Sequence, residues 1–214
     1  MKFSKELLKV FESNKFLVEE NPESVLAEFE DFLSLHNVYL SYNPELFHKA
    51  IKGRYDLCDG ILEFYKKASL SNERISFLED LFVIGYDRDK LVELVLDVFE
   101  AEKYPSNLWE YGALLYNIRK YNYLSRYIKI IENKSYGTAR QMIVLLVGKS
   151  KKAEVIPVLK LLLNDPDVYG HALDALTNFS GEDIDYIMMQ YMDHKVTWVK
   201  NTAKKYLKKR GIIK

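Results

Sequence analysis

The stretch AEVIPVLKLLLNDPDVYGHALDAL, residues 153–176, decides the fold. It consists of an apolar helical segment, an Asp-Pro-Asp turn at residues 165–167 and a second helical segment that contains small residues. Copies of this second segment open at Thr138, before the stretch, and at Asp193, after it. Equivalent positions in the three copies are separated by 29 and 31 residues: Val147, Leu176 and Leu207. A repeat of about thirty residues built from paired helices is typical of an α-solenoid.

The side-chain pattern within one copy explains why it repeats. Val168, Ala172 and Leu176 follow the i, i+4, i+8 spacing of one helical stripe. Ala172 and Ala175 are small, so this helix can approach a neighbour closely, and an aspartate of the preceding turn can cap it. Each helix pair leaves an apolar face that only the next pair can cover. The predicted fold class is therefore all-α, an α-α superhelix of antiparallel helix pairs.

The segment 153–176 resembles HEAT-like repeats of the type found in phycobilin lyases and in many bacterial scaffold proteins. The resemblance is strongest over residues 136–210 and fades toward the N-terminus. The last copy departs from the pattern, because Lys200 occupies the usual arginine position and Tyr206 replaces the small residue before Leu207. The resemblance implies a HEAT-like solenoid. It does not imply one function, because HEAT repeats occur in enzymes, adaptors and inhibitors alike.

The whole chain, residues 1–214, is predicted to form a single helical-repeat domain. We expect about thirteen helices, the first over residues 3–16, and no strand; residues 38–41 are expected to form an extended connector. Residues 1–70 do not show the repeat clearly and are predicted to form an irregular capping portion. Residues 71–214 are predicted to form HEAT-like helix pairs.

Composition limits the cellular setting. The 214 residues are 48% hydrophobic with a formal net charge of zero, which suits a globular protein and not a disordered one. The N-terminal residues read as an amphipathic helix and not as a signal peptide, and no apolar run approaches the roughly 20 residues that span a bilayer. The single cysteine, Cys58, fits a reducing compartment, so a cytoplasmic location is expected.

The sequence indicates no catalytic, cofactor-binding or metal-ligating residue. The four histidines fall on different predicted elements without i, i+4 pairing: His36, His48, His171 and His194. The segment 147–150 (VGKS) lacks the upstream glycine and the preceding strand of a phosphate-binding loop. Gly148 is interpreted instead as the C-cap of a helix.

Charge and aromatic residues indicate a partner-binding surface. Residues 1–100 hold 12 Lys and Arg against 20 Asp and Glu, whereas residues 101–214 hold 19 against 11. Tyrosines crowd residues 104–127 around Trp109, and basic residues follow one another along the last predicted helix, 196–209. Aromatic residues are common interface anchors, and a basic helix attracts acidic partners or nucleic acid. The candidate partner-binding residues are Trp109, Tyr111, Tyr116, Trp198, Lys200, Lys204 and Lys208.

Three functions are compatible with these observations. The first is a non-enzymatic scaffold that binds another protein, with an acidic protein suiting the basic helix. The second is a nucleic-acid protein resembling the HEAT-like DNA glycosylases of alkylation repair, which present tryptophans and an essential aspartate in a basic groove. One turn after Trp109 and Trp198, however, stand Ala113 and Thr202. The third, a chaperone for a tetrapyrrole, follows from the repeat resemblance alone. Oligomeric state is left open.

Overall fold

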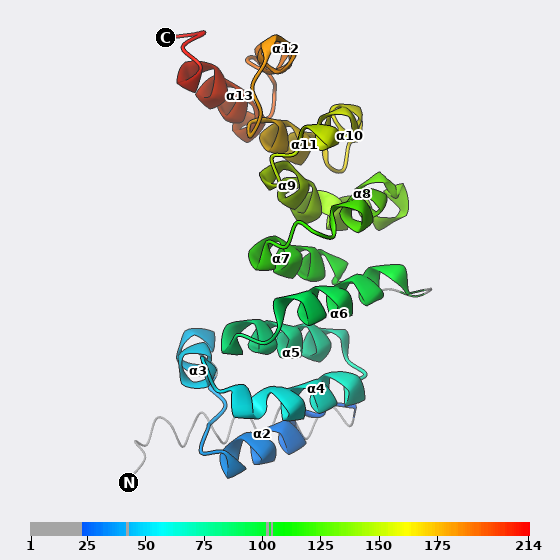
Figure 1. Cartoon of the computed structure of the whole chain (residues 1–214), viewed down its shortest axis with the longest axis vertical. Coiled ribbons are helices and arrows are strands. Elements are labelled where there is room, and N and C mark those ends of the chain that lie inside the picture. The colour runs from blue at the N-terminus through cyan, green and yellow to red at the C-terminus, as the bar shows by residue number, and fades with distance from the viewer. Residues whose placement is uncertain (1–22, 42, 102, 104) are drawn as a thin grey trace. The chain divides into compact units, whose positions relative to one another are not determined.

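The computed structural model describes residues 23–41, 43–101, 103 and 105–214 (Figure 1). These residues form twelve α-helices and three short 3-10 helices and contain no strand, as the all-α prediction requires. The predicted helix over residues 3–16 lies outside the described residues. The chain divides into two compact units, Met1–Val95 and Leu96–Lys214, which we call unit 1 and unit 2.

The described part of unit 1 contains four complete α-helices and one 3-10 helix. They are α2 (Leu26–Leu35), α3 (Pro44–Ile51), η1 (Tyr55–Leu57), α4 (Cys58–Lys67) and α5 (Ser71–Ile84). The next helix, α6 (Arg88–Glu100), crosses the boundary between the units. Among these helices α2 contacts α4, and α5 contacts both α3 and α4. The predicted boundary at residue 70 separates α5 from α3 and α4, whereas the contacts show that α5 packs with them.

Local sequence sets where the helices of unit 1 begin. Asn43 caps α3, because its side-chain oxygen accepts a hydrogen bond from the Glu45 amide at 3.0 Å, and Pro44 occupies the first turn. Before α2, the buried carboxylate of Glu73 accepts hydrogen bonds from the Ser24 hydroxyl and the Val25 amide. Glu73 lies on α5, so this contact ties the start of α2 to a helix far along the chain.

The core of unit 1 is centred on phenylalanine rings. Phe29 of α2 lies 4.9 Å from Phe77 of α5 and 5.2 Å from Phe64 of α4, centroid to centroid, and both pairs are edge-to-face. This is a favourable arrangement for aromatic pairs. Cys58 is also buried, and burial raises the pKa of its thiol, so the group is not poised as a nucleophile.

Unit 2 contains seven α-helices after the end of α6. They are α7 (Leu108–Ile118), α8 (Leu124–Glu132), α9 (Gln141–Lys149), α10 (Ile156–Leu162), α11 (Tyr169–Leu176), α12 (Glu182–Gln190) and α13 (Thr197–Lys209). Two 3-10 helices, η2 (Lys134–Arg140) and η3 (Ala153–Val155), precede α9 and α10.

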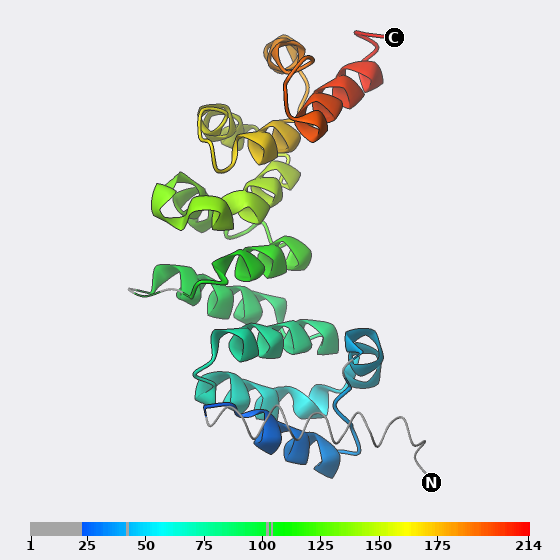
Figure 2. The same ribbon diagram turned by 180° about the vertical axis from the view of Figure 1, so that it is seen from behind.

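These helices are arranged in two rows (Figures 1 and 2). In one row α7 contacts α9, α9 contacts α11, and α11 contacts α13. The second row consists of α8, α10 and α12, which pack against α9, α11 and α13 respectively. In the first row, α9 and α11 are thus each covered by their successor in that row and by one helix of the second.

Small residues set the spacing between α9 and α11. A Cβ atom at position 148 would lie 2.5 Å from the Cβ of Ala175. The two helices can therefore approach this closely only because residue 148 is a glycine. The interpretation of Gly148 as a C-cap is therefore wrong. Gly148 lies inside α9, which ends one residue later, and its role is a close contact between helices that local sequence does not reveal. Ala172 is fully buried on the same helix as Ala175, as its spacing predicted.

No helix in the described part of the chain is both long enough and apolar enough to cross a membrane. The predicted connector at residues 38–41 is not helical and forms no strand.

Candidate functional site

The exposed side of the first row of unit 2 brings aromatic and basic residues together. On each helix its half-buried and exposed side chains recur at helical spacing. Interactions between neighbouring helices join them into one surface: Tyr116 with Lys149, Asp174 with Lys149 and Lys205, and His171 with Trp198. We call this surface the α7–α13 face. Its residues are Trp109, Ala113 and Tyr116 of α7, Met142, Leu145 and Lys149 of α9, His171 and Asp174 of α11, Asn178 just after α11, and Trp198, Thr202, Lys205 and Lys209 of α13.

Two tryptophans mark the start of α7 and of α13 on this face. Trp109 is 44% exposed, and its indole Nε1 donates a hydrogen bond to Oε1 of Gln141 on α9 at 3.3 Å. Trp198 is 46% exposed and lies over the backbone of Gly170, where a Cβ atom would come within 2.3 Å of the indole. Each indole therefore has one side held by the neighbouring helix and the other open to solvent.

Cations gather near the C-terminal ends of α7 and α9. The Lys149 ammonium lies 4.0 Å from the centroid of the Tyr116 ring, and the Arg119 guanidinium lies 5.9 Å from the same ring. Both distances are within the range of cation–π attraction. Tyr116 is half-buried, so one part of its ring packs against unit 2 while another part faces these charges.

Asp174 and His171 occupy the middle of the face, one turn apart on α11. Burial raises the pKa of Asp174, although His171, Lys149 and Lys205 oppose that shift. Burial also lowers the pKa of His171, which Asp174 partly opposes, so the uncharged imidazole is favoured. The His171 ring lies 5.5 Å from the Trp198 ring. The centre of the face thus carries the Asp174 carboxyl group between Lys149 and Lys205.

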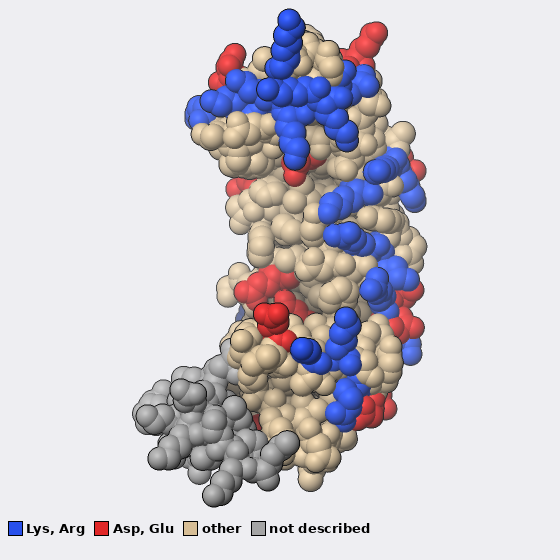
Figure 3. Space-filling model, turned by 90° about the vertical axis from the view of Figure 1, so that its left-hand side faces the viewer, with Lys and Arg blue, Asp and Glu red and all other residues tan. Residues whose placement is uncertain are grey.

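The lysines of α13 lie on two different sides of that helix. At about 100° per residue, Lys205 and Lys209 are within about 20° of Trp198, whereas Lys200 and Lys204 are about 160° and 120° away. The attraction between Lys205 and Asp174 places Lys205 on the α11 side, in agreement with this geometry. Figure 3 shows Lys and Arg side chains gathered in a band over α13.

The sequence-derived candidates therefore separate into three groups. Trp109, Tyr116 and Trp198 lie on the α7–α13 face. Lys200 and Lys204 lie on the far side of α13, and Lys208 lies between the two sides, about 80° from Trp198. Tyr111 is 1% exposed and packs in the core, so it contributes no contact surface. Tyr104, in the same aromatic cluster, lies outside the described residues.

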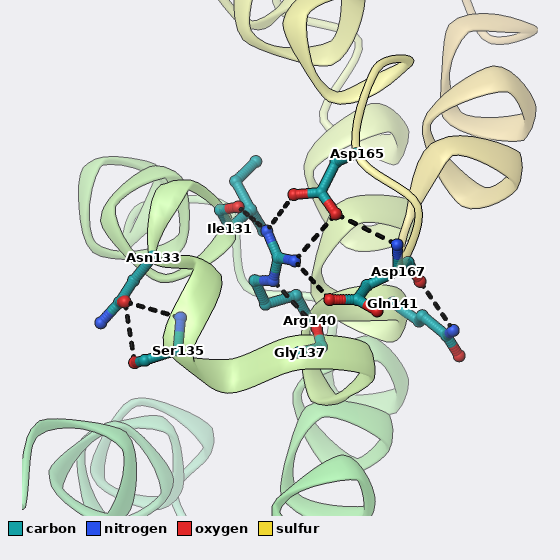
Figure 4. Close-up of polar contacts among 8 residues, drawn as sticks. All are labelled: Ile131, Asn133, Ser135, Gly137, Arg140, Gln141, Asp165 and Asp167. Atoms are coloured by element: carbon teal, nitrogen blue, oxygen red, sulfur yellow. Dashed lines mark hydrogen bonds and ion pairs between the residues drawn. The ribbon is translucent and has the colours of Figure 1, made fainter.

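A buried ion pair holds the helices that carry the face, and the sequence analysis did not identify it (Figure 4). Arg140 is fully buried, and its guanidinium donates to both carboxylate oxygens of Asp165, at 2.9 and 3.2 Å. It also donates to the carbonyl oxygens of Ile131 and Gly137, at 3.0 and 2.9 Å. These bonds join the end of α8, the η2 segment and the turn before α11.

Asp165 is charged in this setting. Burial alone would raise the pKa of its carboxyl group, but hydrogen bonds from Arg140 and from the Asp167 amide hold that pKa below its usual value. The sequence signal was an arginine followed 25 residues later by an Asp-Pro-Asp turn. The predicted cap of the following helix by an aspartate of that turn is wrong: the N-cap residue of α11 is Val168, with no side-chain cap hydrogen bond, and Asp165 pairs with Arg140 instead.

A second polar contact fixes α13 against α12. The Asp185 carboxylate accepts hydrogen bonds from the Tyr206 hydroxyl at 2.7 Å and from the Arg210 guanidinium at 3.1 Å, and these two donors lower the pKa of Asp185. Burial, with the hydrogen bond to Asp185, raises the pKa of Tyr206 to about 12. This contact gives a reason for a tyrosine at position 206, where the repeat pattern has a small residue.

No protein-family model, curated protein or solved structure matches this chain. No group of three or more His, Cys, Asp or Glu side chains suited to a metal ion occurs among the residues that the structure describes.

Proposed function

We propose that unit 2 is a HEAT-like solenoid whose α7–α13 face binds an acidic segment of another protein. The two rows of helices support the repeat assignment, because each helix pair is covered by the next along the same direction. Two contacts tie successive helix pairs together: Gly148 packs closely against Ala175 between α9 and α11, and Arg140 pairs with Asp165 at the turn before α11.

The observation that carries the functional proposal is the combination of open aromatic side chains and cations on one face. Trp109 and Trp198 each leave almost half of the side chain exposed although large aromatic surfaces are favourably buried. Tryptophans of this kind are the commonest hot spots of protein interfaces. Lys149, Lys205 and Lys209 lie on the same face, so an apolar segment that carries carboxylates complements it in both respects.

A protein partner suits this face better than a nucleic-acid backbone. Tight binding to DNA requires neutralisation of many phosphates, and the whole chain has a formal net charge of zero. Asp174 also lies between the lysines of the face, where it would repel a phosphate. A peptide can place its carboxylates beside the lysines and an apolar side chain over the centre of the face.

The two tryptophans of the chain allow a direct test, because both lie on this face. We would titrate the full-length protein with short synthetic peptides in which Asp and Glu alternate with Leu or Phe, and record intrinsic fluorescence. A saturable change in emission that weakens as salt increases is expected. Basic peptides of matched apolar content are the control. Equal responses to acidic and basic peptides, or no response to either series, would refute the proposal.

A second candidate is action on DNA, in the manner of the HEAT-like glycosylases of alkylation repair. One observation favours it: Asp174 lies on the face that also carries both tryptophans, although on α11 and not one turn after either indole. The test is release of an alkylated base from duplex DNA. Release that is lost in the variant Asp174→Asn would establish this candidate, and intact substrate after prolonged incubation would exclude it.

A further inference from the structure

A cavity in unit 1 contains a buried carboxylate to which no described residue donates a hydrogen bond. The cavity has a volume of about 300 Å³, opens to the surface and is lined by residues of α2, α3, α5 and the 40–41 segment. This volume lies at the lower end of the range for small-molecule sites. Asp80 of α5 lines it and is only 6% exposed. Nε2 of His48 lies 3.6 Å from the carboxylate, which is beyond hydrogen-bond distance.

Asp80 makes no hydrogen bond with a described residue, and the His48 imidazole at 3.6 Å is the ion-pair contact that the structure gives it. Burial, together with the nearby Glu79, raises the pKa of Asp80 to about 8. The other buried acid of the cavity, Glu73, is satisfied by the Ser24 hydroxyl and the Val25 amide and so needs no ligand. Uncompensated buried charges are costly, and in natural proteins they are paired or bind a cation. Asp80 is therefore the group in this cavity that a ligand would satisfy.

The rest of the lining indicates what kind of ligand fits. The phenyl rings of Phe29, Phe47 and Phe77 line the cavity beside Asp80, and all three residues are buried. The faces of aromatic rings attract cations, and ring edges and apolar side chains pack against hydrocarbon. The lining combines acidic groups with a mainly apolar wall, which suits neither an anion nor a strongly hydrated metal ion.

We propose that this cavity binds a small organic cation, an ammonium group on an apolar stem, with the Asp80 carboxylate as its counter-ion. The ammonium displaces the proton of Asp80, so that one proton is released to solvent for each cation bound at neutral pH. His48, at the mouth of the cavity, is 37% exposed and can turn toward solvent as the ammonium takes its place beside Asp80. The site lies wholly in unit 1 and does not depend on the function proposed for unit 2.

The titratable groups that face the cavity are few. His48 comes from α3, and Glu73 and Glu79 come with Asp80 from α5. The lining residues of α2 and of the 40–41 segment are Leu26, Phe29, Leu40 and Ser41, none of which titrates. The proton released on binding is therefore assigned by replacing Asp80 and, separately, His48.

Calorimetry on the full-length protein tests the proposal with two ammonium probes. Phenethylamine represents a free small amine, and Nα-acetyl-lysine methylamide represents a lysine side chain presented by a peptide. The neutral analogue 2-phenylethanol is the control for apolar burial. Binding of phenethylamine is expected, with proton release seen as a dependence of the heat on the ionisation enthalpy of the buffer. Binding of the lysine probe alone would assign the same site to a peptide lysine, and binding of neither amine would overturn the proposal.

Two matched variants decide whether Asp80 is responsible. Asp80→Asn should weaken amine binding at least tenfold and abolish the proton release. This variant should fold, because the amide removes a buried charge, and its midpoint of thermal unfolding by circular dichroism should equal or exceed that of the unmodified protein. Glu79→Gln changes an exposed acid of the same cavity and should retain most of the affinity. His48→Gln should still release the proton. Equal amine affinity in Asp80→Asn and the unmodified protein would overturn the proposal.

Discussion

Replacing Arg140 with methionine should destabilise unit 2 more than almost any other single change. The guanidinium makes four hydrogen bonds of 3.2 Å or shorter, two to Asp165 and one each to the carbonyls of Ile131 and Gly137. Methionine preserves much of the side-chain length but leaves Asp165 buried without its counter-ion. Breaking a buried ion pair from one side costs about 3–5 kcal/mol. At roughly 2–4 °C per kcal/mol, the unfolding midpoint should fall by roughly 6–20 °C.

Tryptophan fluorescence is the appropriate assay, because both tryptophans of the chain lie in unit 2. Circular dichroism would add the helices of unit 1 to the signal, and the two units need not unfold together. The double variant Arg140→Met/Asp165→Leu removes both charges and should be more stable than Arg140→Met alone. If Arg140→Met lowered the free energy of unfolding by less than about 1 kcal/mol, the buried Arg140–Asp165 pair would not be a major stabilising contact of unit 2. A double variant whose loss equals the sum of the two single losses would lead to the same conclusion.

The same pair predicts how stability depends on pH. Because the pKa of Asp165 is lower in the folded state than its unfolded value of about 3.9, the pair contributes fully above that value. Its contribution is lost as the pH falls through the folded pKa. Unit 2 of Arg140→Met should therefore lose less stability than the unmodified protein between pH 5 and strongly acidic pH, as measured by urea unfolding. An identical acid dependence in both proteins would contradict the assigned pKa shift.

Three further changes test separate contacts of unit 2. Gly148→Ala should lower the free energy of unfolding by about 1–3 kcal/mol, because the new methyl group would collide with Ala175. This cost should exceed the gain from the better helix propensity of alanine. A variant that is more stable in urea unfolding would contradict the contact. Tyr206→Phe should cost about 1–3 kcal/mol through the lost hydrogen bond to Asp185, and an unchanged unfolding midpoint would argue against that bond. Trp198→Ala should weaken binding of an acidic peptide by about 2 kcal/mol or more with the circular dichroism spectrum preserved, and unaltered affinity would remove this indole from the interface.

The helices could be predicted from the sequence because their signals are local. Apolar residues at helical spacing and the repeat around residues 138–211 predict helices, and the last predicted helix, 196–209, is observed as α13, Thr197–Lys209. The role of a residue near a helix end could not be predicted from local sequence, because it depends on which other helix packs against that end. Gly148 illustrates this point: its role is set by Ala175, which lies on the next helix of the row.

The candidate site could be predicted only in part, because its formation depends on contacts between distant residues. Exposed tryptophans were recognisable by residue type, whereas the burial of Tyr111 depends on which side of α7 packs inward. Spacing grouped Lys200, Lys204 and Lys208 on one side of a helix. Which side of that helix faces α11 depends on tertiary packing, and the structure shows that Lys205 and Lys209 lie on that side. The cavity around Asp80 joins three helices of unit 1, so no run of sequence reveals it.

The most direct test of the proposed function compares two charge reversals on α13. Lys205→Glu/Lys209→Glu alters the α7–α13 face, whereas Lys200→Glu/Lys204→Glu makes the same change in net charge on the far side of the helix. Affinity for the acidic peptide that gives the strongest fluorescence response would be measured at several salt concentrations. The first variant should lose about tenfold or more, with a larger loss at low salt, and the second should stay within about threefold of the unmodified protein. Equal losses in the two variants, or no loss in the first, would contradict binding at this face.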